Sequence, residues 1–258
     1  MIKLDKLKQN GEKITCLTAY DASFASIIDQ AGIDILLVGD SLGMVVQGQA
    51  STVPVTLDDM IYHCQLVARA RQKSLLIVDM PFMSYSTPEI AFEAAARLMR
   101  EGQAQMVKLE GAWVAETIEM LVERGIPVCG HLGLTPQSVY TLGGYRVQGR
   151  DEENAQRLKE EALLLQSVGA SLIVLECLPG ELAAEITASL RIPTIGIGAG
   201  KDCDGQVLVL YDMLGITIGK IPSFSKDFLQ ETGSITTAIS AFIQAVKNGT
   251  FPSSEHTF

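Results

Sequence analysis

Six ionisable residues end or directly follow short apolar runs of the sequence. The runs are ILLVGDS, LLIVDMP, MVKLEG, PVCGHLG and LIVLECLP, and the residues are Asp40, Asp79, Lys108, Glu110, His131 and Glu176. Short apolar runs bounded by turn residues are typical of strands buried on both faces. Because parallel α/β folds bind ligands at the carboxyl ends of their strands, we expect these six side chains to face one site.

Asp40 and Asp79 end the second and third expected strands, which would be neighbours in a barrel. Two carboxylates that converge repel each other unless they share a proton or bind a cation. Oxygen ligands with no cysteine and little histidine favour Mg²⁺ over zinc. The alternative, that each acid only caps the turn or helix that follows it, stays open.

Lys108 and Glu110 lie on the same side of the fourth expected strand, because side chains alternate along a strand. They could form only a buried ion pair inside a barrel. In the functional interpretation, Lys108 binds an anionic carboxylate and Glu110 holds a metal-bound water. His131 ends the fifth expected strand, and it is either a structural hydrogen-bonding residue or part of the site.

Glu176 ends the most apolar strand, between Leu175 and Cys177. Apolar surroundings raise the pKa of a carboxyl group, which suits a general base. The alternative is that Glu176 caps a helix beginning at about Gly180. The glycine-rich GIGAG segment, residues 196–200, lacks the dinucleotide fingerprint, and tight turn geometry explains it better than a phosphate site.

Together these groups could carry out metal-assisted chemistry on a 2-oxo acid. A divalent cation held by Asp40 and Asp79 could chelate the carbonyl and carboxylate of such an acid. It would then stabilise the enolate that forms when Glu176 removes the proton next to the carbonyl. The sequence therefore predicts metal-assisted formation or cleavage of a carbon–carbon bond.

Eight apolar runs that alternate with helical segments would position these residues. The expected strands cover residues 14–20, 33–41, 74–82, 105–111, 126–133, 171–179, 192–200 and 206–215. Asp21 and Thr87 are expected to cap helices, with Pro88 in the first turn of the second. This order predicts a single (β/α)8 TIM barrel domain over residues 1–258 with a short N-terminal extension. Residues 134–150 show no clear period, and we expect a loop there that could act as a lid.

The composition limits the partners of the chain. Lys plus Arg total 20 against 30 for Asp plus Glu, a formal net charge of −10, which argues against nucleic acid or an anionic membrane as the main partner. The N-terminus has no apolar signal core, and no run is long enough for a membrane span. The 5 cysteines are widely spaced, which indicates a reducing compartment without a disulfide framework. We therefore expect a cytoplasmic protein that binds small-molecule substrates.

Motifs along nearly the whole chain resemble the ketopantoate hydroxymethyltransferase family. They are TAYDASFA, VGDSLGMVVQG, STVPVT, DMPFMSY, VKLEG, VCGHLGLTPQS, GGYRVQGR, LECLP, IGIGAG and DGQVLVLYDMLG, and they follow the order of the family. The resemblance implies a (β/α)8 barrel of pantothenate biosynthesis. It also implies transfer of a one-carbon unit from the co-substrate 5,10-methylenetetrahydrofolate to 3-methyl-2-oxobutanoate, which gives 2-dehydropantoate.

The resemblance also implies roles for individual residues. It places the cofactor Mg²⁺ at Asp40 and Asp79, with Glu110 completing the metal site. The residues that would hold the substrate are Asp40, Ser41, Asp79 and Lys108. Glu176 would be the proton acceptor, with His131 as a possible auxiliary, and the chain would form a homodecamer.

Two other functions fit parts of the pattern. A barrel of the isocitrate lyase or phosphoenolpyruvate mutase type also places Mg²⁺ and acids at strand ends, but its usual cysteine-bearing gating loop has no counterpart in this sequence. A barrel that binds a metabolite without turnover would need no general base.

Overall fold

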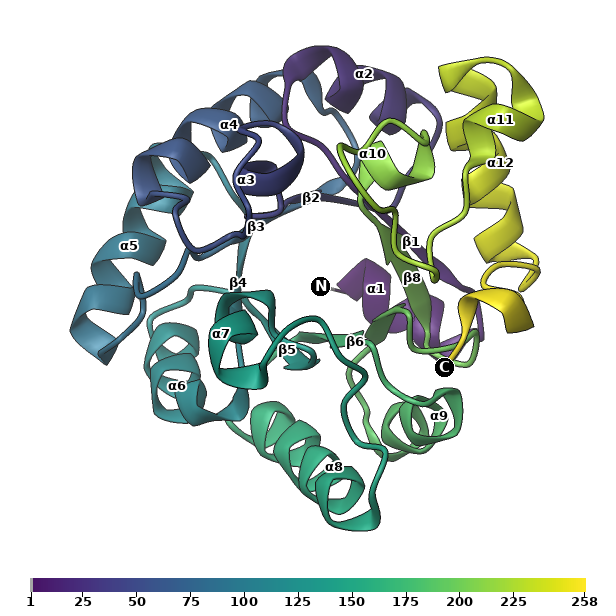
Figure 1. Cartoon of the computed structure of the whole chain (residues 1–258). Coiled ribbons are helices and arrows are strands. Elements are labelled where there is room, and N and C mark those ends of the chain that lie inside the picture. Colours follow the sequence, from purple (N-terminus) through teal and green to yellow (C-terminus); the bar gives the residue numbers. More distant parts are fainter. Residues whose placement is uncertain (1) are drawn as a thin grey trace.

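Eight parallel strands close into a barrel in the computed structural model, which describes residues 2–258. The strands are β1 (Ile14–Thr18), β2 (Ile35–Val38), β3 (Leu75–Asp79), β4 (Met106–Glu110), β5 (Val128–Gly133), β6 (Leu172–Glu176), β7 (Thr194–Ile197) and β8 (Gly205–Leu208). Each strand pairs with the next, and β8 pairs with β1 to close the ring (Figure 1). The expected (β/α)8 barrel is confirmed.

Helices surround the barrel on its outside (Figure 1). The longer ones are α2 (Ala22–Gln30), α4 (Leu57–Ala70), α5 (Pro88–Arg100), α6 (Ala115–Glu123), α8 (Glu152–Ser167), α9 (Gly180–Ser189) and α12 (Ile235–Lys247). The Asp21 carboxylate accepts a hydrogen bond from the Phe24 N–H, and the Thr87 hydroxyl accepts one from the Ile90 N–H. Both expected helix caps are therefore present.

Short helices occupy the connections. They are α3 (Leu42–Val45), α7 (Val139–Leu142), α10 (Leu210–Met213), α11 (Phe228–Thr232) and the 3₁₀ turns η1 (Ala112–Val114), η2 (Pro136–Ser138) and η3 (Ser254–His256). The expected irregular loop over residues 134–150 thus contains η2 and α7. No helix within residues 2–258 is both long and apolar enough to cross a bilayer.

The strands are buried on both faces, which explains why their sequences are unbroken apolar runs. Side chains such as Leu36, Val107 and Leu175 pack against the surrounding helices. The alternate side chains, such as Ile35 and Met106, fill the barrel interior in a separate apolar cluster. Four strands continue this interior row from an apolar residue to an ionisable one at the carboxyl end. The pairs are Ile77 with Asp79, Met106 with Lys108, Cys129 with His131 and Val174 with Glu176.

The N-terminal extension forms helix α1 (Ile2–Gln9), which covers the opposite end of the barrel, behind the strands in Figure 1. Leu4 is 2% exposed and belongs to the interior apolar cluster. The Lys8 ammonium donates to Asp204 at 2.7 Å, just before β8 begins. The extension therefore closes the amino ends of the strands, so that the open mouth lies at their carboxyl ends.

The eighth strand is shorter than expected. The sequence predicts a strand over residues 206–215, but β8 ends at Leu208 and Leu210–Met213 forms helix α10. The Leu210 N–H donates to the Thr18 hydroxyl at 2.8 Å instead of extending the strand ladder. Leu210 and Met213 are fully buried, so the apolar run continues through the helix and hides the boundary.

All five cysteines are free and buried in the structure.

Replacing Leu4 by alanine tests the closing role of α1. Because Leu4 packs into the barrel interior, the Leu4→Ala variant should lose about 2–5 kcal/mol of unfolding free energy in urea. Lys6→Ala, at an exposed position of the same helix, should stay within about 0.5 kcal/mol of the parent chain. Equal small losses in the two variants would show that α1 does not close the barrel in solution.

Candidate active site

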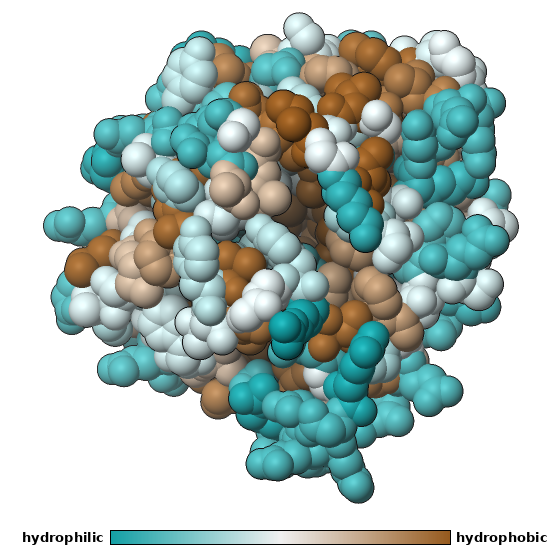
Figure 2. All heavy atoms as spheres, in the orientation of Figure 1, coloured by the Kyte–Doolittle hydropathy of each residue, from teal (hydrophilic) through white to brown (hydrophobic). Residues whose placement is uncertain are grey.

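The mouth of the barrel is the side that faces the viewer in Figure 1. Figure 2 shows the same face as spheres, hollowed near its centre, with hydrophobic side chains around the hollow and mostly hydrophilic ones at the margin. The six ionisable residues of the apolar runs come from β3, β4, β5, β6 and the turn after β2. The interior rows of β3, β4, β5 and β6 bring five of them to this mouth, as expected from side-chain alternation. Asp40 does not follow that row and reaches the mouth from the turn after β2, where its backbone N–H contacts Asp79 and its carboxylate contacts Gln137.

Asp79 connects Asp40 and Lys108. Its Oδ2 accepts the Asp40 N–H at 3.1 Å, and its Oδ1 accepts the Lys108 ammonium at 2.5 Å. Parallel pairing of β3 with β4 places Asp79 directly beside Lys108. Lys108 therefore pairs with the neighbouring strand's Asp79, and the buried Lys108–Glu110 pair that the sequence left open does not form.

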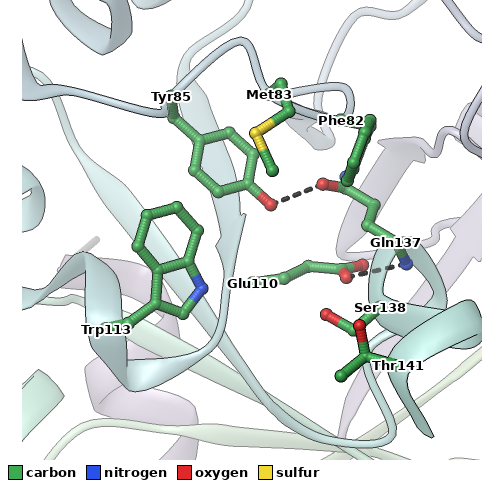
Figure 3. Close-up of a pocket in the computed structure, with 8 residues that line it drawn as sticks. All are labelled: Phe82, Met83, Tyr85, Glu110, Trp113, Gln137, Ser138 and Thr141. Carbon is green, nitrogen blue, oxygen red and sulfur yellow. Dashed lines mark hydrogen bonds between the residues drawn. The ribbon is translucent and has the colours of Figure 1, made fainter.

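Gln137 joins Asp40 to Glu110, although nothing in the sequence pattern singled it out as a site residue. Its side-chain amide donates to Asp40 Oδ2 at 2.8 Å, and its backbone N–H donates to Glu110 Oε2 at 3.1 Å. The Tyr85 hydroxyl donates to Gln137 Oε1 at 2.5 Å (Figure 3). Buried amides need such partners. The one signal in the sequence was the position of Gln137 in the irregular segment after His131.

His131 lies between two glutamates. Its Nδ1 is 3.3 Å from Glu110 Oε1, and its Nε2 is 3.2 Å from Glu176 Oε2. Neither contact is aligned as a hydrogen bond, so the interaction is mainly one of charge. Burial and the Lys108 charge oppose protonation of His131, but the two carboxylates outweigh them and raise its pKa to about 9. His131 is therefore an imidazolium at neutral pH.

Glu176 does not stand in wholly apolar surroundings, contrary to the sequence-based expectation. Its side chain is 14% exposed and faces the His131 ring. The apolar pattern of the two segments could not reveal this contact between His131 and Glu176. The two side chains meet only because β5 pairs with β6 in the barrel. Glu176 also does not cap α9, since residue 179 occupies the N-cap position and makes no side-chain hydrogen bond there.

Ser41 presents its hydroxyl beside Asp40. The hydroxyl lies 2.9 Å from the Tyr20 hydroxyl and does not cap α3. A Cβ atom at Gly39 would come within 2.8 Å of Ser41 Oγ, so glycine leaves room for this arrangement. Burial raises the pKa of Tyr20, which keeps its hydroxyl protonated and able to donate.

The glycine-rich turn after β7 has the geometry that the sequence indicated. Gly198 and Gly200 have φ values of 58° and 77°, in the left-handed region that glycine adopts without strain.

Residues 134–150 cross the mouth. The Tyr145 hydroxyl is 3.4 Å from Met44 Sδ on α3, and the Gln148 N–H donates to the Cys177 carbonyl at 2.9 Å. The segment thus spans from β5 towards β2 and returns to the end of β6. Its action as a lid stays a prediction.

The site carries more negative than positive charge. Burial, Asp79 and Glu110 raise the pKa of Asp40 well above the ordinary value. Burial opposes the charge of Lys108, but the same carboxylates raise its pKa and keep it an ammonium. With every group ionised, the four carboxylates of the six residues face one ammonium and one imidazolium, which leaves two negative charges.

A divalent cation suits this charge and these donors. The Glu110 Oε1 atom is buried and has no hydrogen bond, and Asp40 and Asp79 offer further carboxylate oxygens. Within residues 2–258, no three histidine, cysteine or acidic side chains are arranged so that together they could hold a metal ion, so Asp40, Asp79 and Glu110 do not form a ready three-ligand site. Mg²⁺ does not require one, because it is bound through one or two carboxylates and keeps several waters. Asp40, Asp79 and Glu110 therefore fit Mg²⁺ by chemistry.

Known proteins that are similar to this chain in sequence carry the same enzyme description. A family model described as ketopantoate hydroxymethyltransferase matches residues 1–254. The 3-methyl-2-oxobutanoate hydroxymethyltransferase of Nitrosococcus oceani is 60% identical over 253 residues, which cover 98% of this chain and 96% of the relative. The protein of that name from Shewanella sp. strain MR-4 is 62% identical over 254 residues, with the same coverage of 98% and 96%.

Solved structures share the barrel at low identity. A 2,3-dimethylmalate lyase of the PEP mutase/isocitrate lyase superfamily has a TM-score of 0.59 at 16% identity and covers 95% of this chain and 98% of its own. A phosphonopyruvate hydrolase has a TM-score of 0.62 at 11% identity, with 80% of each chain covered. These likenesses concern the fold alone.

Replacing Asp40 by asparagine should stabilise the metal-free chain. Because the folded state raises the pKa of Asp40, keeping its carboxylate charged costs stability at pH 8. That cost decreases as the pH falls below the raised pKa of Asp40 in the folded chain. It is gone below the ordinary pKa of an aspartate in the unfolded chain. Asp40→Asn should therefore gain about 0.5–2 kcal/mol at pH 8 and almost nothing near pH 4. Urea unfolding in EDTA across this range measures the difference.

The control is Asp202→Asn at an exposed position, which should change stability little at either pH. A loss of stability in Asp40→Asn at pH 8 would contradict the charge imbalance inferred for the site.

Proposed function

The chain belongs to the ketopantoate hydroxymethyltransferase family, and we propose that it works through an enolate formed at the barrel mouth. Near-full-length relatives at 60% and 62% identity establish the activity, hydroxymethyl transfer to 3-methyl-2-oxobutanoate. The observation that carries the proposed mechanism is the buried group of carboxylates, in which Glu110 Oε1 has no hydrogen bond and Glu176 lies at the edge beside His131. A barrel of this fold that acts on another substrate class is disfavoured, because the family match covers residues 1–254.

The substrate would be held by Asp40, Ser41, Asp79 and Lys108. The Ser41 hydroxyl and the Lys108 ammonium are the donors of this set, and both suit the carboxylate and carbonyl oxygens of a 2-oxo acid. Mg²⁺, held by Asp40 and Asp79 with Glu110 completing the site, would polarise the carbonyl and stabilise negative charge on its oxygen.

Glu176 would remove the proton from C3 of the substrate. The His131 imidazolium, 3.2 Å away, orients the Glu176 carboxylate and connects it to Glu110 on its other side. His131 thus acts as a positioning residue rather than as the base, since at neutral pH it already carries its proton.

The one-carbon donor would be 5,10-methylenetetrahydrofolate. The enolate carbon forms a bond to the methylene carbon, both bonds from that carbon to folate nitrogens break, and water supplies the hydroxyl oxygen of 2-dehydropantoate. The two nitrogens of the tetrahydrofolate that leaves take up the proton removed from C3 and one proton of the water. The alternative of a barrel that only binds the metabolite leaves Glu176 and His131 without a task. The homodecamer and the cytoplasmic location stay predictions from the family resemblance and the composition.

Hydrogen exchange at C3 of 3-methyl-2-oxobutanoate isolates the role of Glu176. In D₂O with Mg²⁺, NMR should show exchange catalysed by the parent chain and suppressed by EDTA. Glu176→Gln should slow it about 10²–10⁴-fold, the usual effect of removing a general base. Glu181→Gln, at an exposed position of α9, should exchange like the parent. Undiminished exchange in Glu176→Gln would remove Glu176 as the base, and no exchange in the parent, even with folate, would contradict the enolate.

Calorimetric titration with Mg²⁺ tests the ligand set. Asp79→Asn keeps an acceptor for Lys108 but removes a charge from the metal site, so the affinity should fall about 10-fold or more. Asp212→Asn is the matched control, because Asp212 is also a buried acid but lies on α10, where it accepts from the Thr217 hydroxyl. Unchanged Mg²⁺ affinity in Asp79→Asn would exclude Asp79 as a ligand.

A further inference from the structure

A cavity of about 230 Å³ lies beside the carboxylate site, at the ends of β3, β4 and β5. Its lining combines aromatic, thioether, hydroxyl and carboxylate groups. The residues are Phe82, Met83, Tyr85, Glu110, Trp113, Gln137, Ser138 and Thr141 (Figure 3). Of this lining only Glu110 belongs to the proposed metal site, so most of the cavity has no task in substrate or metal binding.

Trp113 forms an exposed aromatic wall of the cavity. Its ring stacks on Tyr85 with centroids 5.6 Å apart and planes inclined by 24°. Tyr85 is 3% exposed, whereas Trp113 is 60% exposed. A Cβ atom at residue 111 would lie 2.7 Å from Trp113 Cδ1, so Gly111 is needed for this position of the indole. The chain therefore places a large apolar ring where water covers it, which costs free energy unless a ligand binds there.

The opposite side of the cavity is also apolar and exposed. Phe82 is 38% exposed and Met83 is 53% exposed. Met83 has a φ of 61°, a left-handed conformation that is strained for a non-glycine residue. Such strain is found where the surrounding structure holds a side chain in place for binding. Trp113 and Met83 thus line one opening with flat and polarisable surfaces.

The chemistry of the lining selects among ligands. None of the eight described residues that line the cavity is lysine, arginine or histidine, and Glu110 contributes a carboxylate. A small anion such as a 2-oxo acid would be repelled there. A flat ring with N–H donors would stack on Trp113 and could donate to the Glu110 carboxylate.

We propose that this cavity binds the planar nitrogen heterocycle of the one-carbon donor, an inference that rests on the proposed function. Its volume of about 230 Å³ is below the roughly 300–1,000 Å³ of pockets that enclose a whole drug-sized ligand. The cavity therefore takes the ring system, and the remainder of the donor extends into solvent past the exposed edge of Trp113.

The cavity is connected to the reacting centre. Tyr85, which lies under Trp113, donates its hydroxyl hydrogen to Gln137, and Gln137 donates to Asp40. Glu110 borders both the cavity and the carboxylate site. A ring seated against Trp113 thus lies next to the place where the enolate forms, as carbon transfer between the two molecules requires.

Fluorescence can test the binding directly, because the chain contains 1 tryptophan and it is Trp113. Titration of the parent chain with tetrahydrofolate under reducing conditions should quench its emission saturably. The Trp113→Ala variant has no tryptophan and supplies the blank for absorption by the ligand. Glu176→Gln, which should be inactive, should show the same saturable quenching as the parent. Absence of saturable quenching in the parent would overturn the inference.

Steady-state kinetics separates this inference from the proposed function. Trp113→Ala should raise the KM for 5,10-methylenetetrahydrofolate about 10-fold or more, as expected from loss of a stacking surface. The KM for 3-methyl-2-oxobutanoate and the folate-independent C3 exchange should stay at parent values, and Trp113→Phe should restore most of the donor affinity. Tyr62→Ala, which removes an exposed aromatic ring on α4, is the control and should match the parent.

Two results would distinguish failure of the cavity assignment from failure of the proposed function. If the parent makes product from the folate donor and Trp113→Ala keeps its KM for the donor, the cavity does not bind the ring, although the proposed function stands. If the parent makes no product from this donor, the proposed function fails, and the fluorescence titration still decides whether the cavity binds the ring.

Discussion

The carboxylates buried around Lys108 are the constraint on which the site depends. Lys108 pairs directly with Asp79, but burial and the nearby Asp79 and Glu110 carboxylates still raise the pKa of Asp40. A buried charge without a partner is expensive, so the fold must supply compensating groups or leave a place for a cation. It does both, through the His131 imidazolium and through the Glu110 Oε1 atom, which is buried without a hydrogen bond.

The barrel tolerates the free-energy cost of these buried charges because its stability comes from the apolar core away from the site. The interior rows of β3, β4, β5 and β6 are apolar towards α1 and become ionisable towards their carboxyl ends. The unfavourable charge is thereby confined to one end of a well-packed core. Natural active sites commonly give up stability in this way for function. The closure of the other end by Leu4 and its helix leaves a single open mouth where a substrate can meet the carboxylates.

Gln137 and Tyr85 extend the charged group into a network that reaches the aromatic cavity. The Gln137 amide uses its acceptor for Tyr85 and its donors for Asp40 and the Met80 carbonyl, at 2.5, 2.8 and 2.9 Å respectively. A fully bonded amide has one orientation, so it holds Asp40 in place and connects it to the loop that carries Tyr85. The proposed substrate and donor sites therefore share a rigid boundary, in which Glu110 is common to both.

The sequence by itself determined the eight strands, their burial and the ionisable residues at their ends, because an unbroken apolar run between turn residues is a local property of the chain. It could not separate β8 from α10, since both are buried and read as one apolar run. Only the tertiary structure decided the partners: Lys108 with Asp79, His131 with Glu176, and Gln137 with Asp40. These pairs depend on the register between strands and on the path of a loop from a distant part of the chain, and closure of the barrel sets both.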